Sequence, residues 1–308
     1  MTPRQIGLLA ALASIWGGSY LLIKYALEDL SAPMIVWART ALAALVLLIA
    51  MGGAARGAFA DIRRRPGWAI ALGAVSVAIP FSLITFGEHE VPSGLTAVLI
   101  SPAALFVALL APLIDVSERI ERRQAIGLLA GLAGVALVVG VESIQTLGQF
   151  LGAMAMLGAA LFYALGGFVV KGRYGRLTSM QASFVSISIA SLLMLPSAAA
   201  TAPTEMPGLG AIASVIALGV VGTALAFVIF YKLIAEVGAG RASLVSYLAP
   251  GVALFYGAVF LDEEITVAAI AGLVLILGGV ALASRRRVVE AEPVPCAPHG
   301  SEPVASRA

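Results

Sequence analysis

Residues 120–138 read IERRQAIGLLAGLAGVALV, and residues 265–283 read ITVAAIAGLVLILGGVALA. Eight residues of the first stretch, two glycines among them, recur 145 positions later in the second. The beginnings of the two halves also correspond, because Trp16 and Tyr163 each stand eight residues before a lysine. The chain is therefore an internal duplication, and the repeat decides how the rest of the sequence is divided.

Apolar runs of about membrane-spanning length fill both copies of the repeat. A helix that crosses a membrane needs about 20 mostly apolar residues, and the runs are apolar all round, which favours helices over alternating strands. The ten runs cover residues 5–25, 33–51, 67–87, 93–113, 124–141, 150–170, 180–200, 209–231, 241–261 and 265–284. The predicted organisation is a first five-helix repeat over 1–142, a second over 143–284 and a disordered polar tail over 285–308.

The composition places these runs in lipid. The 308 residues are 60% hydrophobic and only 12% charged, whereas soluble domains carry about 25% charged residues. The single cysteine, Cys296, lies in the polar tail, so the fold cannot depend on a disulfide within the chain. The sequence therefore predicts an all-α integral membrane protein.

Basic residues fix the expected orientation. When the ten runs are threaded through a membrane, 17 of the 19 lysines and arginines fall on the same side as the N-terminus, and only Lys24 and Arg39 lie within helices. Cytoplasmic segments carry such an excess of basic residues. Both termini are therefore predicted to be cytoplasmic, in a multi-pass protein of the cell inner membrane.

An odd number of helices in each half means that the second half enters the membrane from the opposite side. Inverted repeats of this kind are typical of secondary transporters, whose substrate site lies where the two halves meet. Transport is thus the leading interpretation. A membrane-embedded enzyme, a channel and a structural membrane protein stay open as alternatives.

The residues of both halves resemble the EamA family of the drug/metabolite transporter superfamily, over about residues 5–284. The stretches that carry this resemblance are Trp16-Gly17-Gly18-Ser19 with Lys24, Arg39, Ile216 to Ala226, Gly238 to Ser243, Leu248-Ala249-Pro250, Phe260 to Thr266 and Gly278-Gly279-Val280. The resemblance implies ten helices, cytoplasmic termini and a central cavity. Within the family, the sequence is most similar to bacterial exporters of aromatic and other amino acids.

Acidic residues lie in predicted loops, at helix ends or in the tail, so no carboxylate is expected in the membrane interior. Proton-coupled exporters of cations generally use such a buried acid, and its expected absence predicts transport that needs no proton gradient. The two histidines, His89 and His299, and the missing buried acids predict no metal site, no nucleophile–base pair and no cofactor. No nucleic-acid partner is expected.

Polar and aromatic residues within the runs are the candidates for a substrate site. In the ninth run, Ser243, Ser246 and Tyr247 share one helical face. Hydroxyl and aromatic walls suit a zwitterion, although such residues also pack membrane helices together. The predicted substrate-binding residues are Trp16, Ser19, Tyr20, Ser82, Tyr163, Phe227, Ser243, Ser246 and Tyr247.

Three ionisable residues are weaker candidates for a gate or a substrate contact. Lys24 could equally place its ammonium among the outer headgroups. Arg39, six residues into the second run, needs a partner: either a carbonyl or loop acid, or a substrate carboxylate. His89 lies in the turn that follows the third run.

The sequence thus predicts an inner-membrane exporter of amino acids or related small metabolites that works by alternating access. A multidrug or cation antiporter is the alternative within transport. The expected partners are a small-molecule substrate and the lipid bilayer, and a monomer can suffice.

Overall fold

The computed structural model describes residues 1–114, 122–140, 145–173, 177–237 and 244–283, and every regular element in these ranges is helical. The predicted all-α class is confirmed. The predicted disordered tail, Cys296 and Ser243 lie outside the described residues.

The helices follow the apolar runs closely. The first half contains α1 (Pro3–Leu27), α2 (Ala32–Met51), η1 (Gly52–Ala54), α3 (Ala55–Arg64), α4 (Pro66–Gly73), η2 (Ala74–Ala78), α5 (Ile79–Gly87), α6 (Ser93–Ile100), α7 (Ala103–Ile114) and α8 (Arg122–Gly140). The second half contains α9 (Leu147–Arg173), α10 (Ser179–Ala200), α11 (Leu209–Ala217), η3 (Leu218–Leu225), α12 (Ala226–Val237), α14 (Val245–Phe260) and α15 (Val267–Ala283).

Six of these helical stretches are long and apolar enough to cross a membrane, judged by length and composition. They are Pro3–Leu27, Ala32–Arg64, Pro66–Gly87, Leu147–Gly166, Met180–Ala200 and Leu209–Phe230. Four further apolar helices within the described residues are shorter, at Ser93–Val107, Ala125–Val138, Val245–Phe260 and Val267–Leu282. The count of ten spans stays a prediction.

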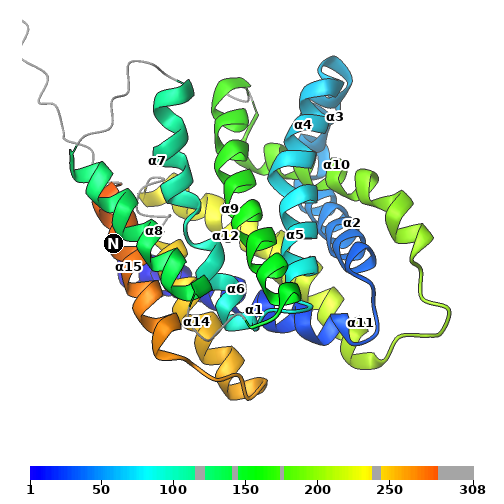
Figure 1. Cartoon of the computed structure of the whole chain (residues 1–308). Helices are drawn as coiled ribbons and strands as arrows, with labels where there is room; N and C mark the ends of the chain where they lie inside the picture. Colours follow the sequence, from blue (N-terminus) through cyan, green and yellow to red (C-terminus); the bar gives the residue numbers. More distant parts are fainter. Residues whose placement is uncertain (115–121, 141–144, 174–176, 238–243, 284–308) are drawn as a thin grey trace, which may run out of the picture.

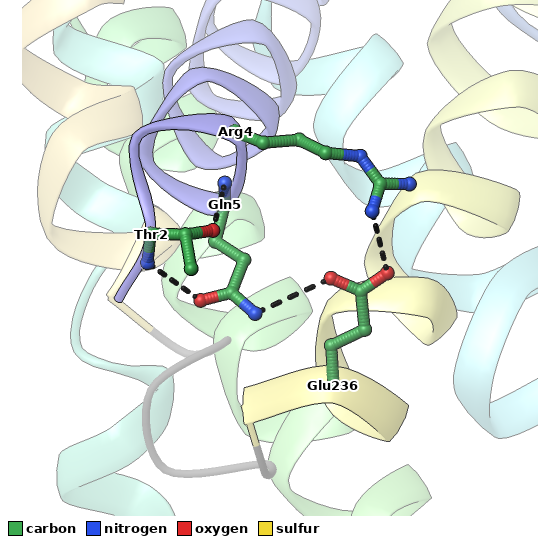
Figure 2. A network of polar contacts seen from close by, with 4 residues as sticks. All are labelled: Thr2, Arg4, Gln5 and Glu236. Atoms are coloured by element: carbon green, nitrogen blue, oxygen red, sulfur yellow. Dashed lines mark hydrogen bonds and ion pairs between the residues drawn. The ribbon is translucent and has the colours of Figure 1, made fainter.

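The start of α1 is defined by its own side chains. The Thr2 amide donates to Oε1 of Gln5 at 2.9 Å and the Gln5 amide donates to the Thr2 hydroxyl at 3.4 Å, which forms a capping box. From this first turn, Gln5 donates to Glu236 at 3.4 Å and Arg4 lies 3.6 Å from the same carboxylate (Figure 2). The N-terminus of α1 is thereby linked to the end of α12.

Helix pairs join the two halves throughout the bundle. Helix α2 packs along α10, α1 along α14, α5 along α9 and α8 along α15, and the pair α8 and α15 lies side by side in Figure 1. When each helix is exchanged for its repeat mate, α2–α10 and α8–α15 are pairs of mates. The contact of α1 with α14 corresponds to that of α9 with α6 and α7. The packing therefore follows the sequence repeat.

The repeated glycines form the contact between α8 and α15. A Cβ atom on Gly134 would lie 2.8 Å from the Gly272 carbonyl oxygen, and a Cβ on Gly272 would lie 2.9 Å from the Gly134 oxygen. Gly279, which is also a repeated glycine, lies against the carbonyl of Gly127 and the backbone of Gly131 on α8. Glycine is needed at these positions because two helix backbones touch there.

Both halves also interrupt a helix with a π-helical segment. Segment η2 lies between α4 and α5, and η3 lies between α11 and α12, so both fall in the third helix of their repeat. A π-helical turn widens the helix by one residue, and such turns occur frequently at functional sites. Segment η3 positions Thr223, which the site described below uses.

Candidate functional site

Arg39 is the buried cation of the bundle. Its side chain is 5% exposed. One terminal guanidinium nitrogen donates to the Thr223 hydroxyl at 3.2 Å, and the guanidinium carbon lies 4.1 Å from the centre of the Phe81 ring. Its Nε has no partner among the described residues. Arg39 therefore joins α2 and α5 of the first half to η3 of the second.

Thr223 owes its position to the π-helical turn. Its hydroxyl donates to the Leu218 carbonyl five residues earlier, at 2.8 Å, and accepts from Arg39 with one of its lone pairs. The partner of Arg39 is thus a hydroxyl from the other half. Neither a carbonyl nor a loop acid was needed to satisfy that nitrogen.

Glu88 is a buried carboxylate that the sequence did not single out. It does lie at a helix end, where its amide donates to the Ile84 carbonyl at 2.9 Å and closes α5. Its side chain, however, is 0% exposed, and neither carboxylate oxygen accepts a hydrogen bond within the described ranges. The Thr96 hydroxyl lies near this carboxyl, but the hydrogen bond that it donates goes to the Pro92 carbonyl, at 3.1 Å. The protein interior therefore holds a carboxylate of the chemical kind that proton coupling can use.

Arg39 and Glu88 form a cluster with two tyrosines and a lysine. Tyr20 and Tyr163 interact electrostatically with each other and with Arg39, and Tyr20 also interacts with Glu88. Lys24, one turn after Tyr20 on α1, acts on Glu88 in the same way. The structure thus brings four predicted residues together with Glu88, which the sequence analysis had placed in a loop.

Other predicted residues pack elsewhere in the structure. The Trp16 ring packs against Phe230 at a tilt of 54°, with ring centroids 5.3 Å apart. The Ser82 hydroxyl donates to the Ala78 carbonyl at 2.7 Å, and Phe227 packs against the apolar cluster between α2 and α10. These contacts are those of helix packing in this conformation.

Ser19 and the residues of α14 give a mixed picture. Ser19 is buried, donates to the Ile15 carbonyl at 2.9 Å and faces Gly222 in η3. Tyr247 packs against a second apolar cluster, which the rings of Tyr20 and Tyr163 also contact. Ser246 is exposed. Ser243 lies outside the described residues, and His89 is exposed in its turn.

The chemical make-up of the cluster is suited to binding. Its hydroxyls are phenols or lie on helix backbones, and no three His, Cys, Asp or Glu residues of the described ranges gather closely enough to hold a metal ion. What the cluster does hold is one buried carboxylate and one buried guanidinium, flanked by tyrosine rings. This composition favours a small polar ligand.

Comparison with known proteins gives a consistent result. The EamA-like transporter family matches the chain twice, over residues 4–140 and 150–285. A "Probable terminal-alkyne amino-acid exporter" of Streptantibioticus cattleyicolor is 28% identical, over 88% of this chain and 90% of that protein. The "Uncharacterized inner membrane transporter YedA" of Escherichia coli K12 is 26% identical, over 82% and 81%.

The fold is also found among solved structures. One crystal structure superimposes with a TM-score of 0.60 at 18% identity, covering 92% of this chain and 97% of the other. At that identity the likeness concerns the fold alone.

Proposed function

The chain belongs to the EamA-like transporter family, and from this premise we propose that it exports amino acids or related small metabolites by alternating access. It is a multi-pass transporter of the inner membrane, in agreement with the names of its relatives. The observation that carries the proposal is the cluster between the halves, in which the half-buried rings of Tyr20 and Tyr163 lie near the buried Arg39 and Glu88. The relative named as a probable amino-acid exporter supports the same substrate class.

The proposed architecture has ten spanning helices in two inverted repeats, residues 1–142 and 143–284, with both termini in the cytoplasm. The double match of the family supports this division. Further support comes from the reciprocal glycine contacts of α8 and α15 and from the π-helical segment in each half. Two halves that meet along such paired helices can rock against each other around a shared site.

The proposed substrate site has Tyr20, Tyr163 and Tyr247 as its aromatic wall. Ser19 stands beside it on α1, and Ser82 and Phe227 line the adjoining helices. Trp16 of α1, Ser246 of α14 and Ser243 complete the proposed set. In an opened conformation these residues would face the space that rocking of the halves creates.

Transport by the purified protein tests the proposal. In liposomes preloaded with unlabelled amino acid, the protein should accumulate labelled phenylalanine, leucine or threonine by counterflow. Tyr163→Ala should reduce this uptake several-fold, because a lost polar contact costs about 0.5–1.5 kcal/mol and the ring is lost with it. Ser188→Ala, on α10 and outside the cluster, should leave uptake unchanged. Absence of counterflow with all three amino acids would refute the proposed substrate class.

Membrane orientation is tested by labelling cysteines in intact cells. Glu205 is exposed between α10 and α11, in a segment proposed to lie outside. Glu205→Cys in a Cys296→Ser background should react with an impermeant maleimide added to cells. The native Cys296 should react only after the cells are permeabilised, and its labelling in intact cells would reverse the proposed topology.

A cation antiporter is the second candidate, because Glu88 is a buried acid of the kind that exchanges a proton for a cation. This candidate predicts that an imposed pH gradient drives a lipophilic cation such as ethidium. The amino-acid proposal predicts that ethidium is neither transported nor able to compete with phenylalanine.

A further inference from the structure

Glu88 and Arg39 are opposite charges that the protein itself leaves incomplete. Both oxygens of Glu88 and the Nε of Arg39 are buried without a hydrogen-bond partner among the described residues. Arginine has five N–H donors, and the structure gives this one a single hydrogen bond, to Thr223. Buried ionic groups are normally paired and fully hydrogen-bonded. The missing contacts therefore indicate that something else completes the site.

The two charges act on each other without forming an ion pair. The carboxylate of Glu88 and the guanidinium of Arg39 interact electrostatically, but no nitrogen of Arg39 lies within 4.0 Å of a Glu88 oxygen. Lys24 also acts on Glu88 and likewise stays beyond that distance. A purely structural pair would be expected to close into direct contact, because only then does the attraction offset the loss of hydration.

We propose that Glu88 and Arg39 bind the two charged ends of a zwitterionic substrate. Glu88 accepts hydrogen bonds from the ammonium group, and Arg39 donates to the carboxylate. The inference rests on the proposed function, since it names the contacts that recognise the part which all α-amino acids share. An ammonium group brings three donors to the two free oxygens, and a carboxylate suits the fork of guanidinium N–H groups.

The surroundings favour a neutral molecule with both charges. The groups that act electrostatically on Glu88 are Lys24 from α1, Arg39 from α2 and Glu263, and Tyr20 from α1 is also near. A zwitterion supplies a partner to each buried charge without changing the net charge of the site. An amine without a carboxylate leaves Arg39 incomplete, and an acid without an amine leaves Glu88 incomplete. The site should therefore select against both.

The place of the pair fits a transporter site. Arg39 is held between α2, α5 and η3, and Glu88 ends α5, so the pair lies against elements of both halves. With Glu88 0% and Arg39 5% exposed, the structure shows the pair closed off from solvent. Movement between the halves would expose it, and the rings of Tyr20 and Tyr163 would flank the substrate side chain.

Binding to the purified full-length protein in detergent tests the inference. Labelled phenylalanine is displaced by phenylalanine, by phenyllactate, which has a hydroxyl in place of the amine, or by phenethylamine, which lacks the carboxylate. The wild type should prefer phenylalanine over both analogues by roughly ten- to hundredfold, the effect of one charged hydrogen-bonded contact. Glu88→Gln should abolish the preference over phenyllactate and keep that over phenethylamine. Arg39→Gln should do the reverse.

Glu90→Gln is the matched control, because Glu90 follows two residues later and is exposed; both preferences should survive it. Thermal unfolding shows whether each variant is folded. If Glu88→Gln does not fold, Glu88→Asp replaces it and should weaken phenylalanine more than phenyllactate. A folded Glu88 variant with an unchanged preference over phenyllactate overturns the inference alone. Wild-type protein that binds none of the three ligands, and shows no counterflow with phenylalanine, leucine or threonine, overturns the proposed function and the inference together.

Discussion

Valine in place of Gly279 should lower the thermal stability of the detergent-solubilised transporter by roughly 5–10 °C. A Cβ atom at this position would lie 2.7 Å from the Gly131 amide nitrogen and would also press on the Gly127 carbonyl. Both obstacles are backbone, so no side chain can turn away to make room. Overpacking of this kind costs about 1–3 kcal/mol and occasionally more, and here α8 and α15 would have to separate.

The neighbouring Gly278 provides the control. It is exposed, and a Cβ atom there would meet nothing within 4 Å. Gly278→Val changes the same residue type in the same helix, so both variants carry the same change in helix propensity. Size-exclusion chromatography after heating measures the unfolding midpoint of each variant, and the midpoint of Gly279→Val should be the lower one. Equal midpoints would show that the α8–α15 contact does not hold the halves together.

The glycine contacts show how much of the fold the sequence could predict. Spacing alone paired Gly127 with Gly272 and Gly134 with Gly279 as repeat mates, and the helical class followed from apolar runs of sufficient length. That these residues touch across a shared axis could not be read from spacing, because a repeat says which residues correspond and not which ones meet. The structure supplies that step.

Less of the candidate site than of the fold could be predicted from the sequence. Arg39 stood out in the sequence because a charge within an apolar run needs a partner. Glu88 did not, because a carboxylate at the end of such a run is ordinarily exposed. Its burial depends on α1, α2 and α6 closing around a short turn, and one-dimensional spacing carries no trace of this.

The contacts that close the two ends of the bundle differ in strength. At the proposed cytoplasmic end, Arg4 and Glu236 form an exposed ion pair at 3.6 Å, and such surface pairs contribute about 0–1 kcal/mol. At the proposed outer end, Glu263 accepts from the Ser93 and Gly94 amides at 2.7 and 3.0 Å. Of these two described contacts, the one at the proposed outer end is therefore the stronger.

Glu263 reaches this position through an unusual backbone turn. Asp262 has a φ of 52°, in the left-handed region that aspartate tolerates better than most residues. Gly257 leaves the space that the Glu263 carboxylate occupies. Helix α6 has no side-chain cap of its own, so this carboxylate from the other half satisfies its first amide groups and its positive end.

Glu263→Gln should consequently loosen the outer end while the inner end stays intact. The amide keeps the size of the carboxylate, but one of its ends becomes a donor facing another donor, and the charge at the helix N-terminus is lost. Hydrogen bonds to a charged group contribute about 1.5–3 kcal/mol. The equilibrium constant for closing the outer end should therefore fall by roughly tenfold or more. A cysteine at Leu95, buried on α6, reports the opening through its reaction with an impermeant maleimide outside cells. In a Cys296→Ser background, labelling of Leu95→Cys should accelerate with Glu263→Gln, and neither Glu264→Gln, at an exposed neighbour, nor Glu236→Gln should change it. Equal labelling in all four proteins would mean that Glu263 caps α6 without holding the halves closed.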